Sequence, residues 1–450
     1  MPAISADIIA YRGHGPLLPS LRRARHALHG CRIMRAFYSS LFYLIIPFVM
    51  LRLVWRGIKA PDYLSRWRER FAFYDKNFPE DVIWFHAVSV GEAEALFPLI
   101  RQIQHRQPDA KLLITTTTPT GSARVTAVMK NTVAHVYLPY DTPDAVNRFM
   151  QCFKPRLAVI METEIWPNLY AYCGKNKIPL YIINARLSEK SARAYQKISA
   201  LVHPALAEVG RIATQTQDDS RRFIAIGASG EKVTSLGNIK FDIDISQELI
   251  EQGLQLKAGL FSKRFVWICA STHKDEEKIC LEIYREIKQK IPELLLLIAP
   301  RHPERFLDVK KQAGQLRLEV VTRTSGDVCL PSTDIYLIDT LGELKMLYTA
   351  SDIAFIGGSL VPVGGHNILE AAAAGVPVVF GPYMANFKEI AQGMLTHGAA
   401  IQCPDKDAVV NAILALYKDS AYRKELAEKA RQFVRQNQGA IARICDMLAL

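Results

Sequence analysis

Three glutamates in the first half of the chain have the residue type and placement for acid–base chemistry. Glu92 follows the glycine-containing turn HAVSVG, and Glu162 and Glu164 follow the apolar run LAVIM in the segment METEIWPN. A carboxylate at such a turn is either a partner of the helix dipole or a general base, and for a single glutamate after glycine the dipole role is the more common. Two carboxylates that leave a buried strand are more informative, because buried-edge carboxylates need partners. Arg186 and Lys240 are the candidate partners.

Small and hydroxyl-bearing residues accompany these glutamates. Ser89 and Gly91 lie in the turn before Glu92, and the segment TTTTPTGS, which ends the next apolar run, contains Thr120 and Gly121. Hydroxyl groups in such turns suit sugar or anion contacts, and helix N-capping explains any one of them equally well.

In the second half, the stretch FIGGSLVPVGGHNILEAAAAGVPVVFGP predicts a phosphate-binding turn. Its glycines let the backbone approach a ligand, and we expect a helix beginning at His366-Asn367 to direct free N–H groups at a phosphate. Glu370, one turn into that helix, could accept a hydrogen bond from a ribose hydroxyl. The alternative is an ordinary strand–turn–helix connection, and the polar trio His366, Asn367 and Glu370 favours the binding site.

Further polar residues of the second half fall where apolar runs end. Arg301 follows LLLLIAP and could pair with a phosphate. The segment Ala270–His273 is expected to end one strand and cap the next helix. Other candidate contacts are Ser271, Thr272, His273, Leu341, Gly342, Glu343, Gly358 and Ser359. The sequence contains no P-loop, HExxH, GxSxG or metal-ligand spacing, so we expect neither a metal nor another cofactor.

Alternating apolar and helical segments position all of these residues. The first half has seven apolar runs, which are VIWFHA, KLLITT, AHVYL, LAVIM, YIIN, RIAT and VTSL. The second half has FVWICA, LLLLIAP, LEVVT, IYLI, IAFIG, VPVVFG and AAIQC. This alternation predicts two doubly wound α/β domains whose parallel sheets are covered by helices, with a ligand cleft between their strand ends.

The N-terminus combines positive charge with an apolar segment. The chain has 450 residues and a formal charge of +12, and residues 1–80 hold 13 Lys/Arg against 5 Asp/Glu. Sixteen uncharged residues lie between Arg35 and Arg52, just short of the roughly 17–25 that span a bilayer. We interpret this segment as a membrane anchor, interfacial or shallow rather than a robust span, with a buried core helix as the alternative.

The cysteine content of the chain indicates its cellular compartment. The eight cysteines are scattered without a CxxC pair, which favours reduced thiols in the cytoplasm.

We expect a leader at 1–33, either disordered or added by an upstream start codon with Met34 as the alternative start. The remaining boundaries are an anchor helix at 34–60, a first α/β domain at 61–241, a linker at 242–262, and a second α/β domain at 263–450 whose last helix could cross back.

Several longer motifs occur together in one order: HAVSVGE, TTTTPTGS, LPYDTPDAVNRF, METEIWPN, NARLSEKS, GNIKFD, ASTH, PRHPERF, LGEL and GGSLVPVGGHNILEAAAAGVPVVFGP. From about Met34 to the C-terminus, the chain resembles the 3-deoxy-D-manno-octulosonic acid (Kdo) transferases of Gram-negative bacteria. The resemblance implies a GT-B fold of two Rossmann-like domains facing a central cleft. It also implies an enzyme on the cytoplasmic face of the inner membrane that transfers Kdo, with inversion and without a metal, from CMP-Kdo to a lipid A precursor (lipid IVA).

The same resemblance implies roles for individual residues. Glu92 is implied as the general base, with Glu162 and Lys240 as transition-state stabilisers. The implied CMP contacts are Pro300, Arg301, Leu341, Gly342, Glu343, Asn367, Ile368, Leu369 and Glu370. Ile368 stands where proline is common and Leu341 where methionine is common, and neither change removes a charge.

Two other classes of function remain open from the sequence. One is a different GT-B enzyme, either another nucleotide-sugar transferase or a nucleotide-sugar epimerase, and the membrane anchor disfavours the soluble epimerase. The other is a non-enzymatic basic scaffold that binds a membrane surface or nucleic acid. We expect inner-membrane lipids, CMP-Kdo and the lipid A precursor as partners, and no nucleic acid.

Overall fold

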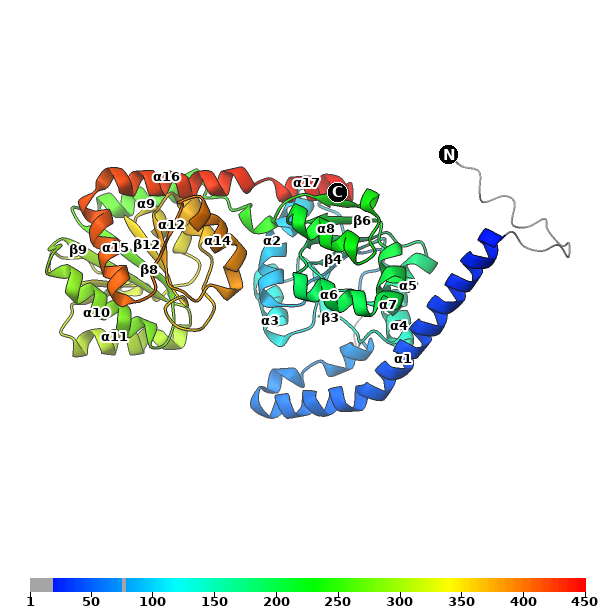
Figure 1. Cartoon of the computed structure of the whole chain (residues 1–450). Coiled ribbons are helices and arrows are strands. Elements are labelled where there is room, and N and C mark those ends of the chain that lie inside the picture. Colours follow the sequence, from blue (N-terminus) through cyan, green and yellow to red (C-terminus); the bar gives the residue numbers. More distant parts are fainter. Residues whose placement is uncertain (1–18, 75–77) are drawn as a thin grey trace, which may run out of the picture. The chain divides into compact units, whose positions relative to one another are not determined.

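The computed structural model describes residues 19–74 and 78–450, which divide into two compact units. The first unit comprises the described residues up to Ile239 together with Ile441–Leu450, and the second runs from Lys240 to Ala440. Each unit is built on one seven-stranded parallel sheet with helices on its faces (Figure 1). The two-domain α/β fold predicted from the alternating apolar runs is therefore confirmed, and each of the fourteen runs coincides with a strand.

The first sheet has the strand order β3-β2-β1-β4-β5-β6-β7. Its strands are β1 (Ile83–His86), β2 (Leu112–Thr116), β3 (Ala134–Tyr137), β4 (Leu157–Met161), β5 (Leu180–Ala185), β6 (Arg211–Thr214) and β7 (Val233–Ser235). Its helices are α2 (Val90–Arg106), α3 (Pro119–Met129), α4 (Pro143–Phe153), α5 (Pro167–Lys175), α6 (Glu189–Lys197), α7 (Ser199–Ala207), α8 (Gln217–Ala225) and α17 (Ala440–Leu448). The order of strands reverses between β1 and β4, and a doubly wound sheet binds ligands beyond the carboxyl ends of its strands at such a point.

The second sheet repeats this plan with the order β10-β11-β9-β8-β12-β13-β14. Its strands are β8 (Phe265–Thr272), β9 (Leu294–Pro300), β10 (Val320–Thr322), β11 (Ile335–Leu337), β12 (Ile353–Ile356), β13 (Val378–Phe380) and β14 (Ile401–Gln402). Its helices are α9 (Gln247–Ala258), α10 (Glu276–Lys288), α11 (Phe306–Gln315), α12 (Leu344–Thr349), α13 (Leu369–Ala374), α14 (Lys388–Thr396), α15 (Lys406–Lys418) and α16 (Ser420–Asn437). The order reverses between β8 and β12.

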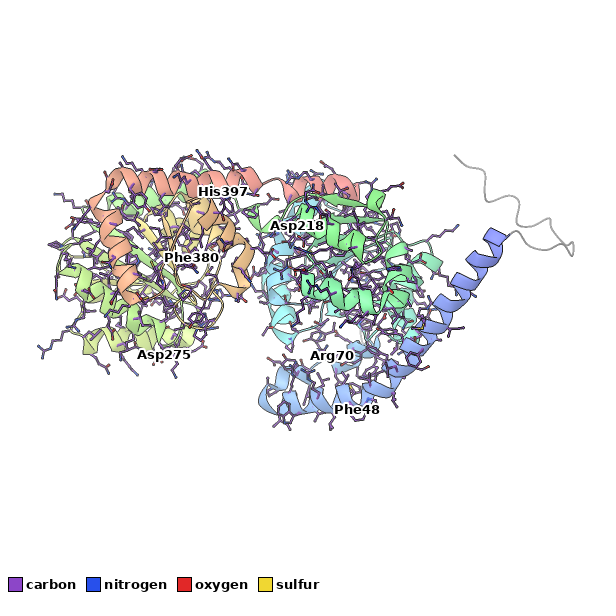
Figure 2. The ribbon with its side chains drawn as sticks, in the orientation of Figure 1. Phe48, Arg70, Asp218, Asp275, Phe380 and His397 are labelled. Carbon is purple, nitrogen blue, oxygen red and sulfur yellow. The ribbon has the colours of Figure 1, made fainter. Side chains whose placement is uncertain are left out.

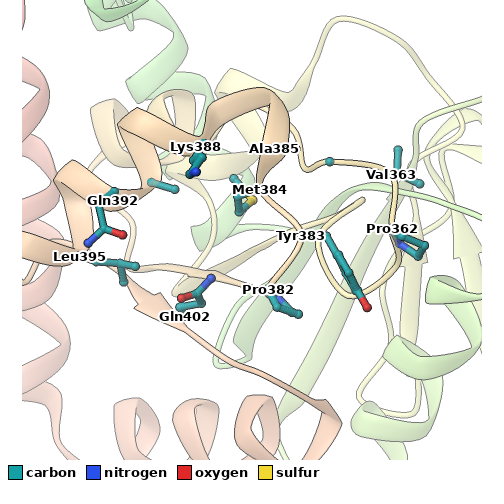
Figure 3. A pocket seen from close by; sticks show the side chains of 12 residues that line it. Pro362, Val363, Pro382, Tyr383, Met384, Ala385, Lys388, Gln392, Leu395 and Gln402 are labelled. Carbon is teal, nitrogen blue, oxygen red and sulfur yellow. The ribbon is translucent and has the colours of Figure 1, made fainter. Parts of the chain in front are cut away.

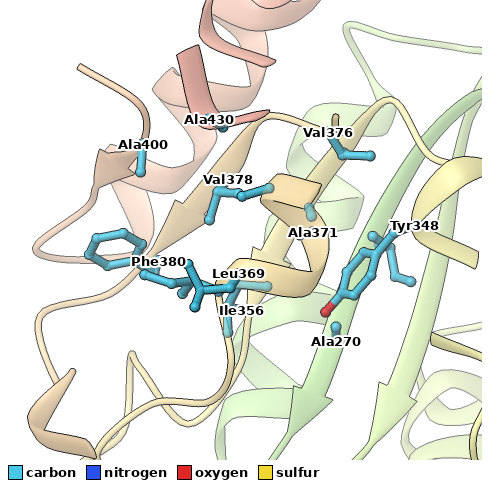
Figure 4. Packing of buried hydrophobic residues seen from close by; sticks show 14 of the residues in the cluster. Ala270, Tyr348, Ile356, Leu369, Ala371, Val376, Val378, Phe380, Ala400 and Ala430 are labelled. Atoms are coloured by element: carbon cyan, nitrogen blue, oxygen red, sulfur yellow. The ribbon is translucent and has the colours of Figure 1, made fainter. Parts of the chain in front are cut away.

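Continuous aliphatic runs form the central strands because helices cover both faces of the sheet. All seven residues of β9 are buried, as expected for a strand inside a parallel sheet. One face packs against α12, α13 and α16, where Phe380, Leu369 and Ala430 meet (Figure 4). The opposite face packs against α10, α11 and α15. Burying a large apolar side chain such as Phe380 contributes about 1.5–3 kcal/mol to folding.

The N-terminal apolar segment belongs to one long helix, α1 (Pro19–Lys59). It bends near Phe48, beside the helix-interrupting Pro47 (Figures 1 and 2). The described part of the expected leader, residues 19–33, is thus helical, whereas residues 1–18 lie outside the described residues. Among the residues that the structure describes, Arg32–Ile58 is the one helical segment long and apolar enough to cross a membrane.

Helix α1 has two different faces. Ser39 is buried and its hydroxyl donates to Asn168 Oδ1 at 3.1 Å, and Leu53 is only 7% exposed, so this face packs on the first unit. The outer face carries exposed apolar side chains at heptad-like spacing, which are Phe37, Leu41, Leu44, Phe48, Leu51, Trp55 and Ile58. A helix with an unburied apolar face of this size fits an interfacial position better than a core position.

The segment that we interpreted as a linker at 242–262 contains helix α9, which packs against α12 within the second unit. The wrong interpretation arose because polar residues dominate its exposed face, although Leu249 and Leu256 contact the core. Residues after Ala440 belong to the first unit, where Arg106 pairs with Asp446 at 2.9 Å.

Candidate active site

Carboxylates cluster at the point where the strand order of the first sheet reverses. Glu92 lies in the first turn of α2, directly after β1, and Glu162 and Glu164 follow β4. Strands β1 and β4 are paired neighbours, with His86 opposite Ile160. The topology therefore brings together the three glutamates that sequence analysis selected.

Glu92 is held by hydrogen bonds to both of its carboxylate oxygens. Ser89 Oγ donates to Oε1 at 3.0 Å, and the Val88 N–H donates to Oε2 at 2.8 Å. Ser89 is also the N-cap of α2, because its hydroxyl accepts from the Glu92 N–H at 3.4 Å. Burial raises the pKa of Glu92, the charge of Glu162 raises it further, and the bonds from Val88 and Ser89 oppose this rise.

Glu164 stands in a strongly acidic environment. Burial raises the pKa of Glu164 to about 7, with further contributions from the charges of Glu92 and Glu162. Glu162 adopts a left-handed conformation with φ of 56°, which directs the chain sharply away from β4. Arg186, a candidate partner of these carboxylates, makes no ion pair among the described residues, and its carbonyl accepts a hydrogen bond from the Thr163 hydroxyl.

The hydroxyl-rich turn after β2 is used mainly for capping. Thr118 is the N-cap of α3, and its Oγ1 accepts from the Gly121 N–H at 3.1 Å. Thr120 is exposed and keeps its hydroxyl close to that of Thr118, at 3.5 Å. Gly91 has open space around its Cα except for Ser89 Oγ. Thr120 and Gly91 are therefore exposed residues of these turns and do not pack in the core.

Lys240 begins the second unit, immediately after a buried polar network in the first. Asn184 is completely buried with φ of 49°, and its Oδ1 accepts from the Ile239 N–H at 3.1 Å. Gln215 donates to the Asn184 carbonyl at 3.0 Å and accepts from Asn238 at 2.8 Å. The Lys240 ammonium lies 5.5 Å from the centroid of the Phe387 ring. This network fixes the backbone that leads into Lys240.

In the second unit, one carboxylate organises the glycine turn after β12. Glu276, completely buried at the start of α10, accepts from the N–H groups of Gly358, Ser359 and Leu360 at 2.6, 3.1 and 2.9 Å. The Ser359 hydroxyl is also used inside the fold, because it accepts from the Gly381 N–H at 2.8 Å. Ser359 is thus a structural residue of this turn, and the backbone N–H and carbonyl of Gly358 are also used inside the fold.

The helix that we expected to begin at His366-Asn367 begins later, at Leu369, and has only six residues. Asn367 Oδ1 accepts from the Leu369 N–H at 3.0 Å, so a side chain already satisfies one of the helix's first donors. Ile368 and Leu369 are completely buried, which leaves only their backbones for a ligand. The predicted helix start is therefore wrong, and the predicted phosphate contact at this turn stays a prediction.

The segment Ala270–His273 ends strand β8 as expected, since β8 runs to Thr272, but it does not supply the N-cap residue of α10. Ser271 has φ of 58°, and Thr272 is completely buried. Helix α10 begins only at Glu276 with Asp275 at its N-cap, so none of Ser271, Thr272 and His273 caps it. The left-handed turn at Ser271 directs the chain so that His273 reaches His366, with the two Nε2 atoms 2.7 Å apart.

The predicted CMP contacts after β9 and β11 differ in how far they are free for a ligand. Arg301 is exposed, and its guanidinium makes no hydrogen bond or ion pair with the described residues. Leu341 is 71% exposed and Gly342 has φ of 88°. Glu343 is already paired with Arg323 at 2.9 Å, and the Arg323 bond lowers the pKa of Glu343.

Sequence analysis missed four residues of these sites. Glu276 could have been suspected from its place three residues after His273, and Arg323 from its place directly after β10. His302 follows Arg301, and its ring lies 5.3 Å from that of His273. Asn184 had no local signal, because its role depends on Ile239, fifty-five residues away.

The second unit contains a cavity of about 450 Å³ (Figure 3). Apolar side chains such as Tyr383, Met384 and Leu395 dominate its wall, and Lys388 supplies a positive charge. None of the predicted CMP contacts lines the cavity. The cavity and the predicted nucleotide contacts are therefore different features of this unit.

Two family models match the chain. Residues 65–243 match the model described as 3-deoxy-D-manno-octulosonic-acid transferase (kdotransferase), and residues 270–433 match glycosyl transferases group 1. The two matches together include most of both units.

Known proteins match over nearly the whole length. The 3-deoxy-D-manno-octulosonic acid transferase of Haemophilus influenzae is 38% identical over 92% of this chain and 98% of its own. The transferase of the same name from Bordetella pertussis is 34% identical over 81% of this chain and 86% of its own.

Solved structures also match the chain. UDP-GlcNAc 2-epimerase from Neisseria meningitidis is 15% identical and covers 82% of this chain and 99% of its own, with a TM-score of 0.53, which supports the two-domain fold alone. The C-terminal CMP-Kdo binding domain of WaaA from Acinetobacter baumannii is 34% identical over 42% of this chain and 99% of its own, with a TM-score of 0.41.

Proposed function

Because the chain belongs to the 3-deoxy-D-manno-octulosonic acid transferase family, we propose that it transfers Kdo from CMP-Kdo to a lipid A precursor with inversion, using Glu92 as the general base. The observation that carries this proposal is the position and chemistry of Glu92. It is a half-buried carboxylate with a raised pKa, beyond the carboxyl end of the central strand β1 and at the switch point of its sheet.

The geometry around Glu92 suits a base that must remove a proton from a sugar hydroxyl. A raised pKa makes the carboxylate a stronger proton acceptor, and efficient general bases have a pKa near the working pH. The bonds from Ser89 and Val88 fix the orientation of the carboxylate while leaving further lone pairs unused. Glu92 would take the proton of the acceptor hydroxyl as the oxygen attacks the anomeric carbon.

Glu162 and Lys240 support this chemistry in the proposal. An anionic donor needs a positive partner, and Lys240 offers one next to a rigid backbone segment held by Asn184. The charge of Glu162 raises the pKa of Glu92 and so strengthens the base. Both residues are therefore assigned to stabilisation of the transition state.

The donor is assigned to the second unit. Arg301 has a guanidinium that described residues leave unpaired, and phosphate groups are favoured partners of such a group. Gly342 and Gly358, both with positive φ, allow the backbone to approach a nucleotide closely. Glu370 is proposed as the contact to the ribose, and the Arg323–Glu343 pair as a fixed wall of the site.

Helix α1 is proposed to hold the enzyme on the cytoplasmic face of the inner membrane, where a lipid acceptor resides. The exposed apolar face of α1 would enter the lipid, and Arg52 and Arg56 would attract anionic headgroups. The packing of Ser39 against Asn168 would keep the first unit close to that surface.

The test is an assay of the purified full chain with CMP-Kdo and a tetraacylated lipid A precursor, with and without EDTA. We expect release of CMP and an increase in the mass of the lipid by whole Kdo residues, at the same rate in EDTA because we propose no metal. Turnover of a UDP-sugar with no release of CMP would contradict the proposal and favour another GT-B activity. Inactivity with both donors would favour the non-enzymatic scaffold.

A further inference from the structure

Two histidines form a proton-sharing pair at the ends of neighbouring strands in the second unit. His273 follows β8, and His366 lies in the loop after β12, which pairs with β8. Their Nε2 atoms are 2.7 Å apart, and their rings are parallel to within 1° with centroids separated by 5.0 Å. At this distance one Nε2–H must donate to the lone pair of the other ring. The pair can therefore carry at most one positive charge, because two imidazolium groups would direct N–H at N–H.

The backbone is shaped around this pair. The Gly365 N–H donates to the Gly358 carbonyl at 2.8 Å, which turns the chain back so that His366 meets His273. Gly358 has φ of 68°, and a Cβ placed there would lie 3.1 Å from His366 Cδ2 and 3.4 Å from His273 Cδ2. A side chain at Gly358 would thus press on both rings, so the turn keeps that space open for the pair.

The groups that face the pair are the Arg301 guanidinium, the His302 ring and a carboxylate that already accepts backbone hydrogen bonds. Arg301 and His302 come from the end of β9, and the Arg301 guanidinium has no partner among the described residues. The neighbouring carboxylate, Glu276 on α10, accepts from the backbone of Gly358 and the two residues after it. The cluster therefore has positive charge without a counterion and suits an anion.

Both imidazoles are kept neutral in the free protein. Burial lowers the pKa of His273, and the charges of His302 and Arg301 lower it further. Burial lowers the pKa of His366 to about 4, followed by the charges of Arg301, His273 and His302. A bound anion would offset these positive charges and restore the affinity of the pair for a proton.

We propose that His273 and His366 bind the phosphate group of the nucleotide and take up one proton from solvent as they do so. This inference rests on the proposed function, since it assumes a nucleotide donor. When the bond between the anomeric carbon and the phosphate oxygen breaks, the electron pair stays on that oxygen, so CMP carries one more negative charge than the phosphodiester. The acceptor proton goes to Glu92, and the proton held by the pair offsets the new charge. The pair thus stabilises the leaving group more than the intact donor, which lowers the barrier.

Calorimetry of the full chain with CMP at pH 7.5 tests this inference. Titrations in HEPES, Tris and imidazole buffers, which differ in ionisation enthalpy, give the number of protons exchanged on binding. CMP is almost fully dianionic at this pH, because the second pKa of a phosphate monoester is about 6. We expect a net uptake approaching one proton per CMP for the wild-type protein.

Variants of the two histidines test whether the pair takes up the proton when CMP binds. In His273→Gln and His366→Gln, we expect proton uptake to disappear and CMP affinity to fall about tenfold. His397→Gln is the matched control, because His397 is an exposed histidine of the same unit that hydrogen-bonds to the Gly393 carbonyl (Figure 2). The control should keep both the uptake and the affinity of the wild-type protein.

A measurement on the wild-type protein removes the dependence on variant folding. With ¹⁵N-labelled histidine, CMP should move the ring nitrogens of the pair toward imidazolium chemical shifts. Binding of CMP with no net uptake, or uptake that persists in both variants, would overturn the inference and leave the nucleotide assignment intact. Failure of CMP to bind would overturn the donor assignment, and the inference would fall with it.

Discussion

Ser89 and Glu92 hold one another in reciprocal hydrogen bonds. The Ser89 hydroxyl accepts from the Glu92 N–H at 3.4 Å and donates to Glu92 Oε1 at 3.0 Å, in the manner of a capping box. Sequence analysis left two alternatives for Glu92, a partner of the helix dipole and a general base. The geometry makes them compatible, because the cap fixes the carboxylate that the proposed mechanism needs.

Removal of the Ser89 hydroxyl should change the pH dependence of the reaction. The bond from Ser89 lowers the pKa of Glu92, so in Ser89→Ala that pKa should rise. A base must be deprotonated to act, and the acid limb of kcat/KM should therefore move to higher pH. Loss of the cap should also destabilise the fold by about 1 kcal/mol.

Ser246→Ala is the matched control for Ser89→Ala. Ser246 caps α9 by accepting from the Leu249 N–H at 3.3 Å, so its loss should cost similar stability. Its pH profile should match that of the wild-type protein. Equal pH profiles for the two variants would show that the Ser89 bond does not tune the base.

Glu164→Gln should stabilise the fold in a pH-dependent way. The pKa of Glu164 is raised to about 7 in the folded chain, above about 4.3 in the unfolded chain, so the folded state holds a proton that the unfolded state releases between these values. The contribution of Glu164 to the free energy of unfolding of the wild type is therefore lost as the pH rises from about 4.3 to about 7. Denaturant unfolding should show Glu164→Gln more stable than the wild type at pH 8 and equal to it near pH 4. The exposed Glu231→Gln should show no such difference, and a pH-independent effect of Glu164→Gln would contradict the prediction.

Arg301→Ala should weaken the binding of CMP by about tenfold or more, because a hydrogen bond to a charged group contributes about 1.5–3 kcal/mol. Calorimetry with CMP measures the effect. Lys310→Ala removes one positive charge from an exposed site on α11 of the same unit and should leave the affinity unchanged. Equal affinities of Arg301→Ala and the wild type would remove Arg301 from the nucleotide site.

The outer face of α1 should determine membrane binding. Leu44 and Leu51 are each 69% exposed, and serine at both positions removes apolar side chains that would gain about 1.5–3 kcal/mol each on full burial in lipid. Sedimentation with vesicles of anionic phospholipid should show a much smaller bound fraction. Serine at Leu254 and Leu307, exposed leucines of the second unit, is the control and should leave binding unchanged. Equal binding of the two double variants would place the membrane contact elsewhere.

The sheets could be predicted from sequence because each strand is a local signal. An apolar run such as LLLLIAP is buried on both faces, and its own composition identifies it as β9. The positions of Glu92, Glu162 and Arg301 followed from the same pattern, since all three lie just beyond strand ends. Their roles came only from the resemblance to a known family.

What could not be predicted depends on contacts between distant residues. The glycine-rich pattern before His366 predicted a helix that begins at His366-Asn367. Asn367 instead precedes the helix, and its side-chain oxygen accepts a hydrogen bond from the Leu369 N–H. Glu343 forms an ion pair with Arg323, which lies twenty residues earlier in the chain. No local sequence pattern near either residue indicates this pair. Glu276 lies eighty-two residues from Gly358, whose turn it holds.

The turnover of Glu92→Gln with CMP-Kdo and the lipid A precursor tests the central claim most directly. Glutamine keeps the shape of the side chain and one of its two acceptor oxygens, so it can still accept from the Val88 N–H while its amide donates to Ser89 Oγ, but it cannot take the acceptor proton at neutral pH. We predict that kcat falls by about 10²–10⁴-fold, the usual contribution of a general base, while CMP affinity and the unfolding temperature stay at their wild-type values. A kcat within a few-fold of the wild type in a folded, CMP-binding variant would contradict the assignment of Glu92 as the base.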